Sequence, residues 1–149
     1  MCIVYKAEKL IAIDLFKHLQ DSKSDFPRSS LIDKAYELSE KWALYADVIT
    51  AKNENGDLLG LIVYYANRLP QVFTTHVWVD VSVRGRGICG KMLKFQERIC
   101  ALKGFTEHHL EVACNNISAI KAYKKFGFDE VELLGSSIIL GKHIDEEYH

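Results

Sequence analysis

The segment from Val79 to Leu93 constrains the fold of this chain more than any other. It indicates an apolar strand, then a turn with Gly85 and Gly87, then an amphipathic helix. The first amides of a helix have no intrahelical partner and carry partial positive charge. Glycine lets a backbone approach an anion closely, and Arg84 and Arg86 add charge-assisted donors. The segment therefore predicts a pyrophosphate site at the start of the helix.

Two other interpretations of this segment are weaker. A plain tight turn with solvated arginines does not explain why the arginines alternate with the glycines directly before a helix. The spacing Gly85-x-Gly87-x-x-Gly90, with Glu111 about twenty residues later, also satisfies the dinucleotide-binding fingerprint. However, residues 82–84 separate the strand from the first glycine, and too little chain follows for the usual parallel half-sheets.

Length and composition set the broad class of the protein. The chain has 149 residues and a formal net charge of −1, so we expect a single domain over residues 1–149 that is neither nucleic-acid-binding nor membrane-bound. Its N-terminus shows no signal peptide, and we expect a cytoplasmic protein. No metal site is predicted, because the four cysteines form no C-x-x-C pair. These are Cys2, Cys89, Cys100 and Cys114.

The periodicity of apolar residues predicts alternating helices and strands, which indicates a mixed α/β domain. The Asn55-Gly56 pair predicts a hairpin turn, and Ser30 with Asp33 resembles a capping box after a polar loop at 21–30. Helices are expected at 9–20, from 31 to about 42, at 87–103 and at 117–126. The expected apolar stripe is Leu10, Ile13, Phe16 and Leu19 in the first helix and Ile88, Met92, Phe95 and Ile99 in the helix at 87–103. Strands are expected at 44–52, 58–66, 71–81, 109–113, 128–133 and 137–141.

Two motifs resemble the GNAT superfamily of N-acetyltransferases. Residues 84–89 resemble its acetyl-coenzyme A signature, Gln/Arg-x-x-Gly-x-Gly/Ala, except that Cys89 replaces the usual glycine or alanine at the last position. Residues 116–128 resemble its Asn-x-x-Ala-(apolar)-x-x-Tyr-x-x-x-Gly-Phe ending. Asn116 also suits the N-cap of a helix on chemical grounds alone. The resemblance implies a central, mostly antiparallel twisted sheet of about six to seven strands, flanked by about four helices.

The resemblance also implies acetyl-CoA as cosubstrate and direct attack of an acceptor amine on the thioester in a ternary complex. A backbone N–H near Val79 would polarise the thioester carbonyl. Tyr123 would donate a proton to the leaving thiolate as general acid. The expected coenzyme-binding residues are Val79, Val81, Arg84, Gly85, Arg86, Gly87, Ile88, Cys89, Gly90, Asn116 and Tyr123.

The general base is less well defined by the sequence. Counting back from Val79 on one face of the strand gives Phe73 and Thr75, and neither is a base. His76 is the nearest candidate, although alternation points it to the other face unless a β-bulge intervenes. A structural role for His76 and a water relay in place of a side-chain base are the alternatives. Weaker candidates are Asp80, His108 and His109.

The sequence leaves several questions open. A non-catalytic acyl-CoA sensor on the same fold is the second functional hypothesis, and a nucleophilic Cys114 is not favoured. Trp42 and Trp78 are expected in the core. The acceptor is expected near residues 21–30 and 133–137, where Asp21, Asp25 and Glu132 could favour a cationic amine. The oligomeric state is undetermined, a homodimer included.

Overall fold

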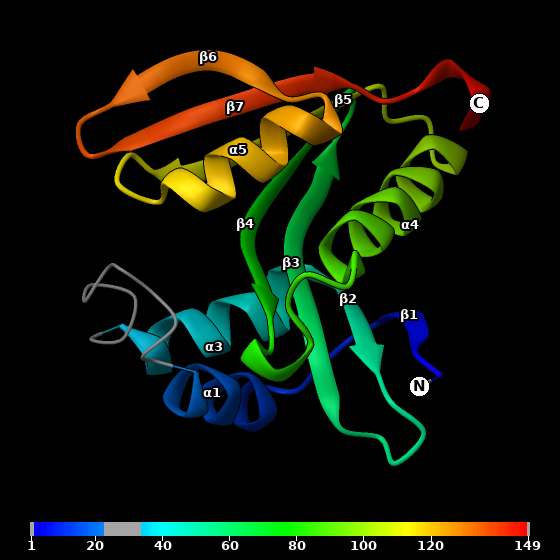
Figure 1. Ribbon diagram of the computed structural model, residues 1–149, viewed down its shortest axis with the longest axis vertical. Helices are drawn as coiled ribbons and strands as arrows, with labels where there is room; N and C mark the ends of the chain where they lie inside the picture. The colour runs from blue at the N-terminus through cyan, green and yellow to red at the C-terminus, as the bar shows by residue number, and fades with distance from the viewer. Residues whose placement is uncertain (1, 23–33, 149) are drawn as a thin grey trace.

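Among residues 2–22 and 34–148, which the computed structural model describes, seven strands form one sheet in the order β1-β2-β3-β4-β5-β7-β6 (Figure 1). The strands are β1 (Val4–Glu8), β2 (Asp47–Lys52), β3 (Leu58–Arg68), β4 (Gln71–Val79), β5 (Glu107–Ala113), β6 (Asp129–Leu134) and β7 (Ser137–His143). The helices are α1 (Ala12–Asp21), α3 (Ala35–Tyr45), α4 (Ile88–Leu102) and α5 (Ile117–Phe126), with 3-10 turns η2 (Val81–Val83) and η3 (Glu146–Tyr148). This arrangement confirms the predicted fold class.

Neighbouring strands of the sheet are antiparallel except for β4 and β5, which run parallel. The β2–β3 hairpin forms as predicted. Its turn is closed by the side-chain oxygen of Asn53, which accepts hydrogen bonds from the amides of Asn55 and Asp57, both at 3.0 Å. Gly56 takes the positive φ of +83° that this turn requires. The parallel pair arises because β4 and β5 are joined through α4, the crossover that parallel strands need.

Each face of the sheet packs against its own pair of helices. On one face, called the α4 face here, Met92 and Leu93 of α4 and Tyr123 of α5 join Ile62 and Leu110 of the sheet in one core cluster. On the other face, called the α1 face, the second cluster contains Leu15 and Leu19 of α1, Trp42 of α3, and Leu61 and Trp78 of the sheet. The predicted burial of both tryptophans is confirmed.

The sequence missed one strand. β1 pairs with β2 at the edge of the sheet, in register from Val4↔Lys52 to Glu8↔Val48. Its residues are all exposed or half-buried, and Lys6 and Glu8 interrupt any apolar pattern. Because an edge strand faces solvent along much of its length, its composition carries little periodic signal.

The buried faces of two helices also differ from the prediction. In α1 the expected stripe included Ile13, which is 70% exposed, whereas Leu15, His18 and Leu19 are buried. In α4 the expected stripe included Phe95 and Ile99, but these are only half-buried, and the helix instead buries a set that includes two polar side chains. The fully buried residues of α4 are Ile88, Met92, Leu93, Gln96, Glu97, Cys100 and Ala101.

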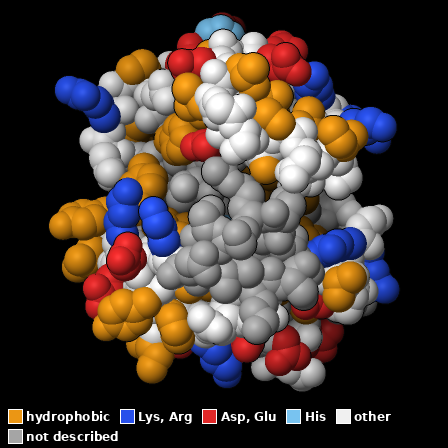
Figure 2. Space-filling view, turned by 90° about the vertical axis from the view of Figure 1, so that its left-hand side faces the viewer, with side chains coloured by type: hydrophobic (Ala, Val, Ile, Leu, Met, Phe, Trp, Pro, Cys, Tyr) orange, Lys and Arg blue, Asp and Glu red, His pale blue; other side chains and the backbone are white. Residues whose placement is uncertain are grey.

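The surface carries no field of one sign on the face drawn in Figure 2, where acidic, basic and apolar side chains are interspersed. Among the described residues, none of the helices has both the length and the apolarity needed to cross a bilayer. The predicted capping box of Ser30 and Asp33, and Asp25 with most of the expected acceptor loop, lie outside the described residues.

Candidate active site

β4 and β5 stop pairing part-way along their length, and this separation of the two strands is called the cleft here. Their parallel ladder covers only four pairs, from Gln71↔Glu107 to Thr74↔Leu110. Beyond Thr74, β4 continues along β3 as far as the pair Val79↔Gly60, whereas β5 continues along β7. The two strands therefore diverge, and α4 and α5 lie on the two sides of the opening (Figure 1).

A β-bulge marks the point of divergence. Val63 of β3 pairs with His76, but the next residue of β3 pairs with Thr74, so Thr75 is an extra residue in β4. The alternation of side chains therefore changes phase at the bulge. Thr74, before the bulge, contacts α4. Val77 and Val79, after the bulge, also lie on the α4 face, where they pack against its core cluster. The count that placed Phe73 on the face of Val79 is wrong for this reason. His76 follows the bulge and stays opposite Val79.

Beyond β4 the chain forms the loop that the sequence singled out. The side chain of Asp80 accepts a hydrogen bond from the amide of Ser82 at 3.1 Å and so caps η2. The buried side chains of Val83 and Ile88 anchor the two ends of the loop in the core. Between these anchors, residues 84–87 are exposed. The loop is thus held firmly at both ends while its central backbone faces solvent.

The two loop glycines leave an open cradle. Gly85 has a φ of +80° and Gly87 a φ of +78°, and no atom lies within 4 Å of the position that a Cβ would occupy at either residue. Gly87 is the N-cap of α4 in the left-handed conformation and makes no side-chain cap. The first amides of α4, at residues 88–90, therefore point out of the helix end with no intrahelical acceptor. This geometry suits an anion with several oxygens.

The side chain of Arg84 helps to hold the loop in place. Its Nε donates a hydrogen bond to the carbonyl oxygen of Val79 at 2.9 Å, across the whole turn. One of its donors thus fixes the loop to the end of β4. Arg86 and Val81 are exposed on the same loop, Val81 with 68% of its surface accessible.

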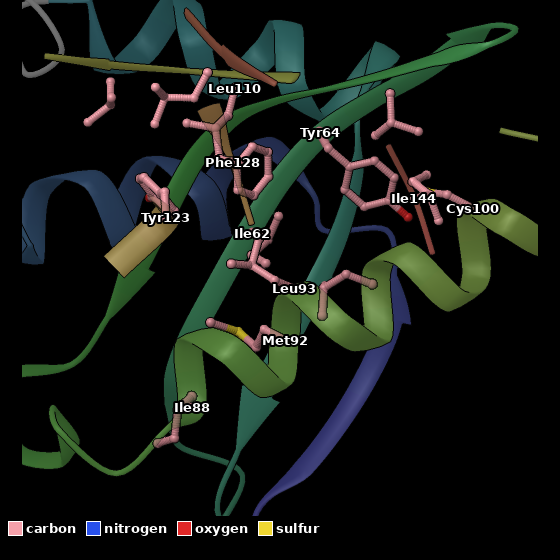
Figure 3. Packing of buried hydrophobic residues seen from close by; sticks show 14 of the residues in the cluster. Ile62, Tyr64, Ile88, Met92, Leu93, Cys100, Leu110, Tyr123, Phe128 and Ile144 are labelled. Atoms are coloured by element: carbon pink, nitrogen blue, oxygen red, sulfur yellow. The ribbon is translucent and has the colours of Figure 1, made fainter. Parts of the chain in front are cut away.

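Tyr123 belongs to the core cluster of the α4 face, and Cys89 packs against the same cluster. Burial, and secondarily the nearby thiol of Cys89, raises the pKa of the Tyr123 hydroxyl above its ordinary value, so it keeps its proton at neutral pH. Burial also raises the pKa of the Cys89 thiol to about 11. Figure 3 shows Tyr123 opposite the start of α4, where Ile88 and Met92 project toward the sheet. The two motifs, far apart in sequence, therefore contribute residues to the same core cluster.

Asn116 is the N-cap of α5, as its sequence position predicts. Its side-chain oxygen accepts a hydrogen bond from the amide of Ala119 at 3.4 Å. Gly127 ends the same helix with a φ of +121°. These two residues set the length of α5 and hence the position of Tyr123, which lies two turns after the cap.

His76 lies away from this cleft, on the α1 face. Its Nε2 is 3.0 Å from Nε2 of His18, and its ring packs against Trp42 with 5.1 Å between ring centroids. Burial, and secondarily His18, lowers the pKa of His76 to about 3. A neutral imidazole with so low a pKa is a weak base at neutral pH. Its environment is that of the structural histidine that the sequence left as an alternative.

The comparisons with known proteins agree with this geometry. The model of the acetyltransferase (GNAT) family matches residues 14–128. The chain belongs to the GNAT acetyltransferase family. This confirms the resemblance seen in the two motifs and the enzyme class that it implies. A search of curated proteins finds no match.

Solved structures share the fold of this GNAT protein at low sequence identity. The PaiA N-acetyltransferase of Thermoplasma acidophilum, in complex with coenzyme A, is 19% identical with a TM-score of 0.75, over 96% of this chain and 99% of that one. An acetyltransferase of the GNAT family from Desulfovibrio desulfuricans is 15% identical with a TM-score of 0.78, over 97% and 100%. A GNAT acetyltransferase from Elizabethkingia anophelis with acetyl-CoA bound is 18% identical with a TM-score of 0.69, over 95% and 97%.

Other candidates of the sequence analysis lie elsewhere in this GNAT fold. Asp80 serves as the cap of η2, and Glu132 is exposed on the edge strand β6. His109 lies in β5 opposite Gly141, where a Cβ would come within 3.0 Å of the imidazole. Asp21 lines a groove of about 630 Å³ between α1, the β2–β3 hairpin and the end of β4.

Sequence reasoning missed a buried polar network at the base of the cleft. It contains Thr74, Gln96, Glu97, His108 and Lys142, which hydrogen bonds link in the order Gln96–Thr74–His108–Glu97–Lys142. One signal could have pointed to it, because Gln96 and Glu97 fall on the side of α4 that also carries Met92 and Leu93. His108 was considered only as a weak candidate base.

Proposed function

We propose that this GNAT protein transfers an acetyl group from acetyl-CoA to a primary amine by direct attack within a ternary complex. The observation that carries the proposal is the open cradle at Gly85 and Gly87, at the start of α4 and beside the divergence of β4 and β5. The residues present fit the coenzyme, because a side chain at either glycine would occupy the space in front of the α4 amides. Coenzyme A and acetyl-CoA in two of the structural neighbours support the same cosubstrate.

Each residue of the site then has a defined task. The amides at the start of α4 and the side chain of Arg86 hold the diphosphate, while Arg84 fixes the loop to Val79. A backbone N–H of β4 near Val79 polarises the thioester carbonyl. Bound acetyl-CoA supplies the activated acyl group.

Tyr123 is the proposed general acid. Its raised pKa keeps the hydroxyl protonated at neutral pH, so it can donate to the thiolate as the carbon–sulfur bond breaks. The proton that the thiolate receives balances the proton that the amine loses. Cys89 lies nearby, but its raised pKa leaves too little thiolate for a covalent acetyl intermediate.

The amine loses its proton to water in this proposal. His76 was the side-chain candidate, but a pKa of about 3 and a close imidazole partner make it a poor acceptor of a proton from an ammonium group. Phe73 and Thr75, the other residues at this level of β4, carry no base. Water relayed through the cleft to bulk solvent fits this arrangement best.

The test is release of free thiol from acetyl-CoA in the presence of a panel of primary amines: an alkylamine, a diamine, an amino sugar, an amino acid and a peptide with a free N-terminus. We expect turnover with at least one class of amine. When both substrates are varied, double-reciprocal plots of the initial rates should give intersecting lines. Parallel lines would contradict direct attack, because they indicate a covalent intermediate.

The acyl-CoA sensor is the second candidate function. Titration calorimetry with acetyl-CoA separates the two, because a sensor binds the coenzyme yet releases no thiol with any amine of the panel. Absence of binding would contradict both.

A further inference from the structure

We propose that Thr74, Gln96, Glu97, His108 and Lys142 form a positioning network, which fixes the point where β4 and β5 separate and ties it to α4. The inference rests on the proposed function, because its consequence is the placement of the two ends of the coenzyme site. The diphosphate end lies at the start of α4, and the thioester end lies along β4 beyond the bulge.

From Gln96 to Glu97, the hydrogen bonds of the network run in one direction. Nε2 of Gln96 donates to Oγ1 of Thr74 at 2.8 Å, and Oγ1 of Thr74 donates to Nε2 of His108 at 2.7 Å. Nδ1 of His108 then donates to Oε2 of Glu97 at 2.6 Å. Nζ of Lys142 donates to the other carboxylate oxygen at 2.7 Å, which places the positive charge of Lys142 beside the carboxylate.

This direction requires a neutral His108 with its proton on Nδ1. A second proton on Nε2 would leave the Thr74 hydroxyl facing two donors, with no acceptor for its own hydrogen. Burial lowers the pKa of His108 despite the opposing effect of Glu97, which favours the neutral form. The geometry and the electrostatics therefore agree.

The network joins four elements at one level of the sheet. Thr74 belongs to the last pair of the β4–β5 ladder and directly precedes the bulge residue Thr75. His108 lies on β5, Glu97 on α4 and Lys142 on β7. The side-chain bond between Thr74 and His108 thus closes the ladder at the vertex of the cleft, and the bonds to α4 hold the helix that carries the cradle.

Stability alone does not account for this arrangement. Thr74, Gln96, Glu97 and His108 are each at most 1% exposed, and buried charged pairs are often no more stabilising than apolar residues of the same volume. Oε1 of Gln96 is buried with no hydrogen-bond partner among the described residues, which carries a desolvation penalty. What such a network does provide is directional contacts that specify one register, and that register sets the shape of the cleft.

The test compares two buried threonines. Thr74→Val removes the central hydroxyl of the network, and Thr74→Ser retains it. Thr50→Val is the matched control. Thr50 lies on β2, away from the cleft, and is 0% exposed, and its Oγ1 donates to Oε2 of Glu8 at 2.6 Å. Each variant is examined by thermal unfolding, by hydrogen exchange of the amides at 75–79, and by calorimetry with acetyl-CoA and with coenzyme A.

We expect Thr74→Val to exchange these amides about ten-fold faster and to bind both coenzymes about ten-fold more weakly, a change of about 1.4 kcal/mol. Thr74→Ser should recover the parent values, and Thr50→Val should lower the unfolding temperature without either effect. Equal exchange and equal affinity in Thr74→Val and Thr50→Val would overturn the proposal. If the parent binds no coenzyme, the proposed function fails, while the exchange comparison still decides whether the network holds the vertex.

Discussion

At the scale of single residues, Gly87 is the most exacting position of the site. Its φ of +78° lies in the left-handed region, and the space in front of it is open. We expect Gly87→Val to abolish coenzyme binding, because the side chain both strains the turn by about 1–2 kcal/mol and fills the cradle. Calorimetry with acetyl-CoA measures the loss.

Gly56→Val is the control for strain. Gly56 has a φ of +83° and equally open surroundings, but it lies in the β2–β3 turn. This variant should lose similar stability and bind acetyl-CoA like the parent. If Gly87→Val binds acetyl-CoA with unchanged affinity, the turn at Gly87 is not part of the coenzyme site.

In the proposed mechanism, Tyr123 supplies the proton for the leaving group. We expect Tyr123→Phe to lower kcat about a hundred-fold with the best amine of the panel, because the thiolate then leaves without a proton donor. Acetyl-CoA affinity should change much less, since the ring still packs against Phe128. Tyr64→Phe, at a buried tyrosine of β3, should leave kcat unchanged. A Tyr123→Phe variant as fast as the parent would exclude Tyr123 as the acid.

At the scale of elements, α5 places Tyr123, and the cap at Asn116 decides where α5 begins. We expect Asn116→Ala to lower the free energy of unfolding by about 1 kcal/mol, because the amide of Ala119 loses its acceptor. Urea unfolding followed by tryptophan fluorescence measures the difference.

Asn116→Ser separates the cap from a contact with the coenzyme. Serine caps nearly as well as asparagine, so stability should stay close to that of the parent. If Asn116 also contacts the coenzyme, as its motif implies, Asn116→Ser still loses acetyl-CoA affinity. A serine variant with parental affinity would limit Asn116 to its capping role.

The elements also show what periodicity does and does not predict. It gave α5 its bounds and its Gly127 ending, because cap and stop signals are local. It misplaced the buried faces of α1 and α4, because the face that a helix buries depends on what packs against it. The bulge at Thr75 has no local signal either, since it is defined by register with Val63 and Tyr64 of β3.

At the scale of the whole molecule, buried neutral histidines make stability depend on pH. The pKa of His76 is lowered to about 3 from 6.5, and that of His108 is also lowered, in both cases chiefly by burial. Below about pH 6.5 the unfolded chain therefore binds protons that the folded chain does not. The stability that His76 contributes is present above that pH and falls as the pH falls from 6.5 toward 3, by up to about 1.4 kcal/mol per pH unit. The lowered pKa of His108 adds a loss of the same sign.

Urea unfolding between pH 7.5 and pH 5 tests this dependence. His76→Gln should flatten the pH slope relative to the parent, because it removes one of the two imidazoles whose pKa is lowered by burial. Ile13→Gln, at an exposed residue that does not titrate, should leave the slope unchanged. A slope as steep in His76→Gln as in the parent would show that His76 titrates alike in the folded and unfolded states.

The sequence by itself determined the order of most helices and strands, the glycine-containing turn before α4 and the cap of α5. These features depend on residues close together in the chain, where glycine, apolar spacing and capping side chains act locally. Only the tertiary structure decided that Tyr123 and Cys89 share one core cluster, that His76 faces α1, and that Thr74 bonds to His108. The bonded residues His108 and Glu97 are 11 positions apart in the chain, and His18 and His76 are 58 positions apart. Strand register and helix packing bring such residues together.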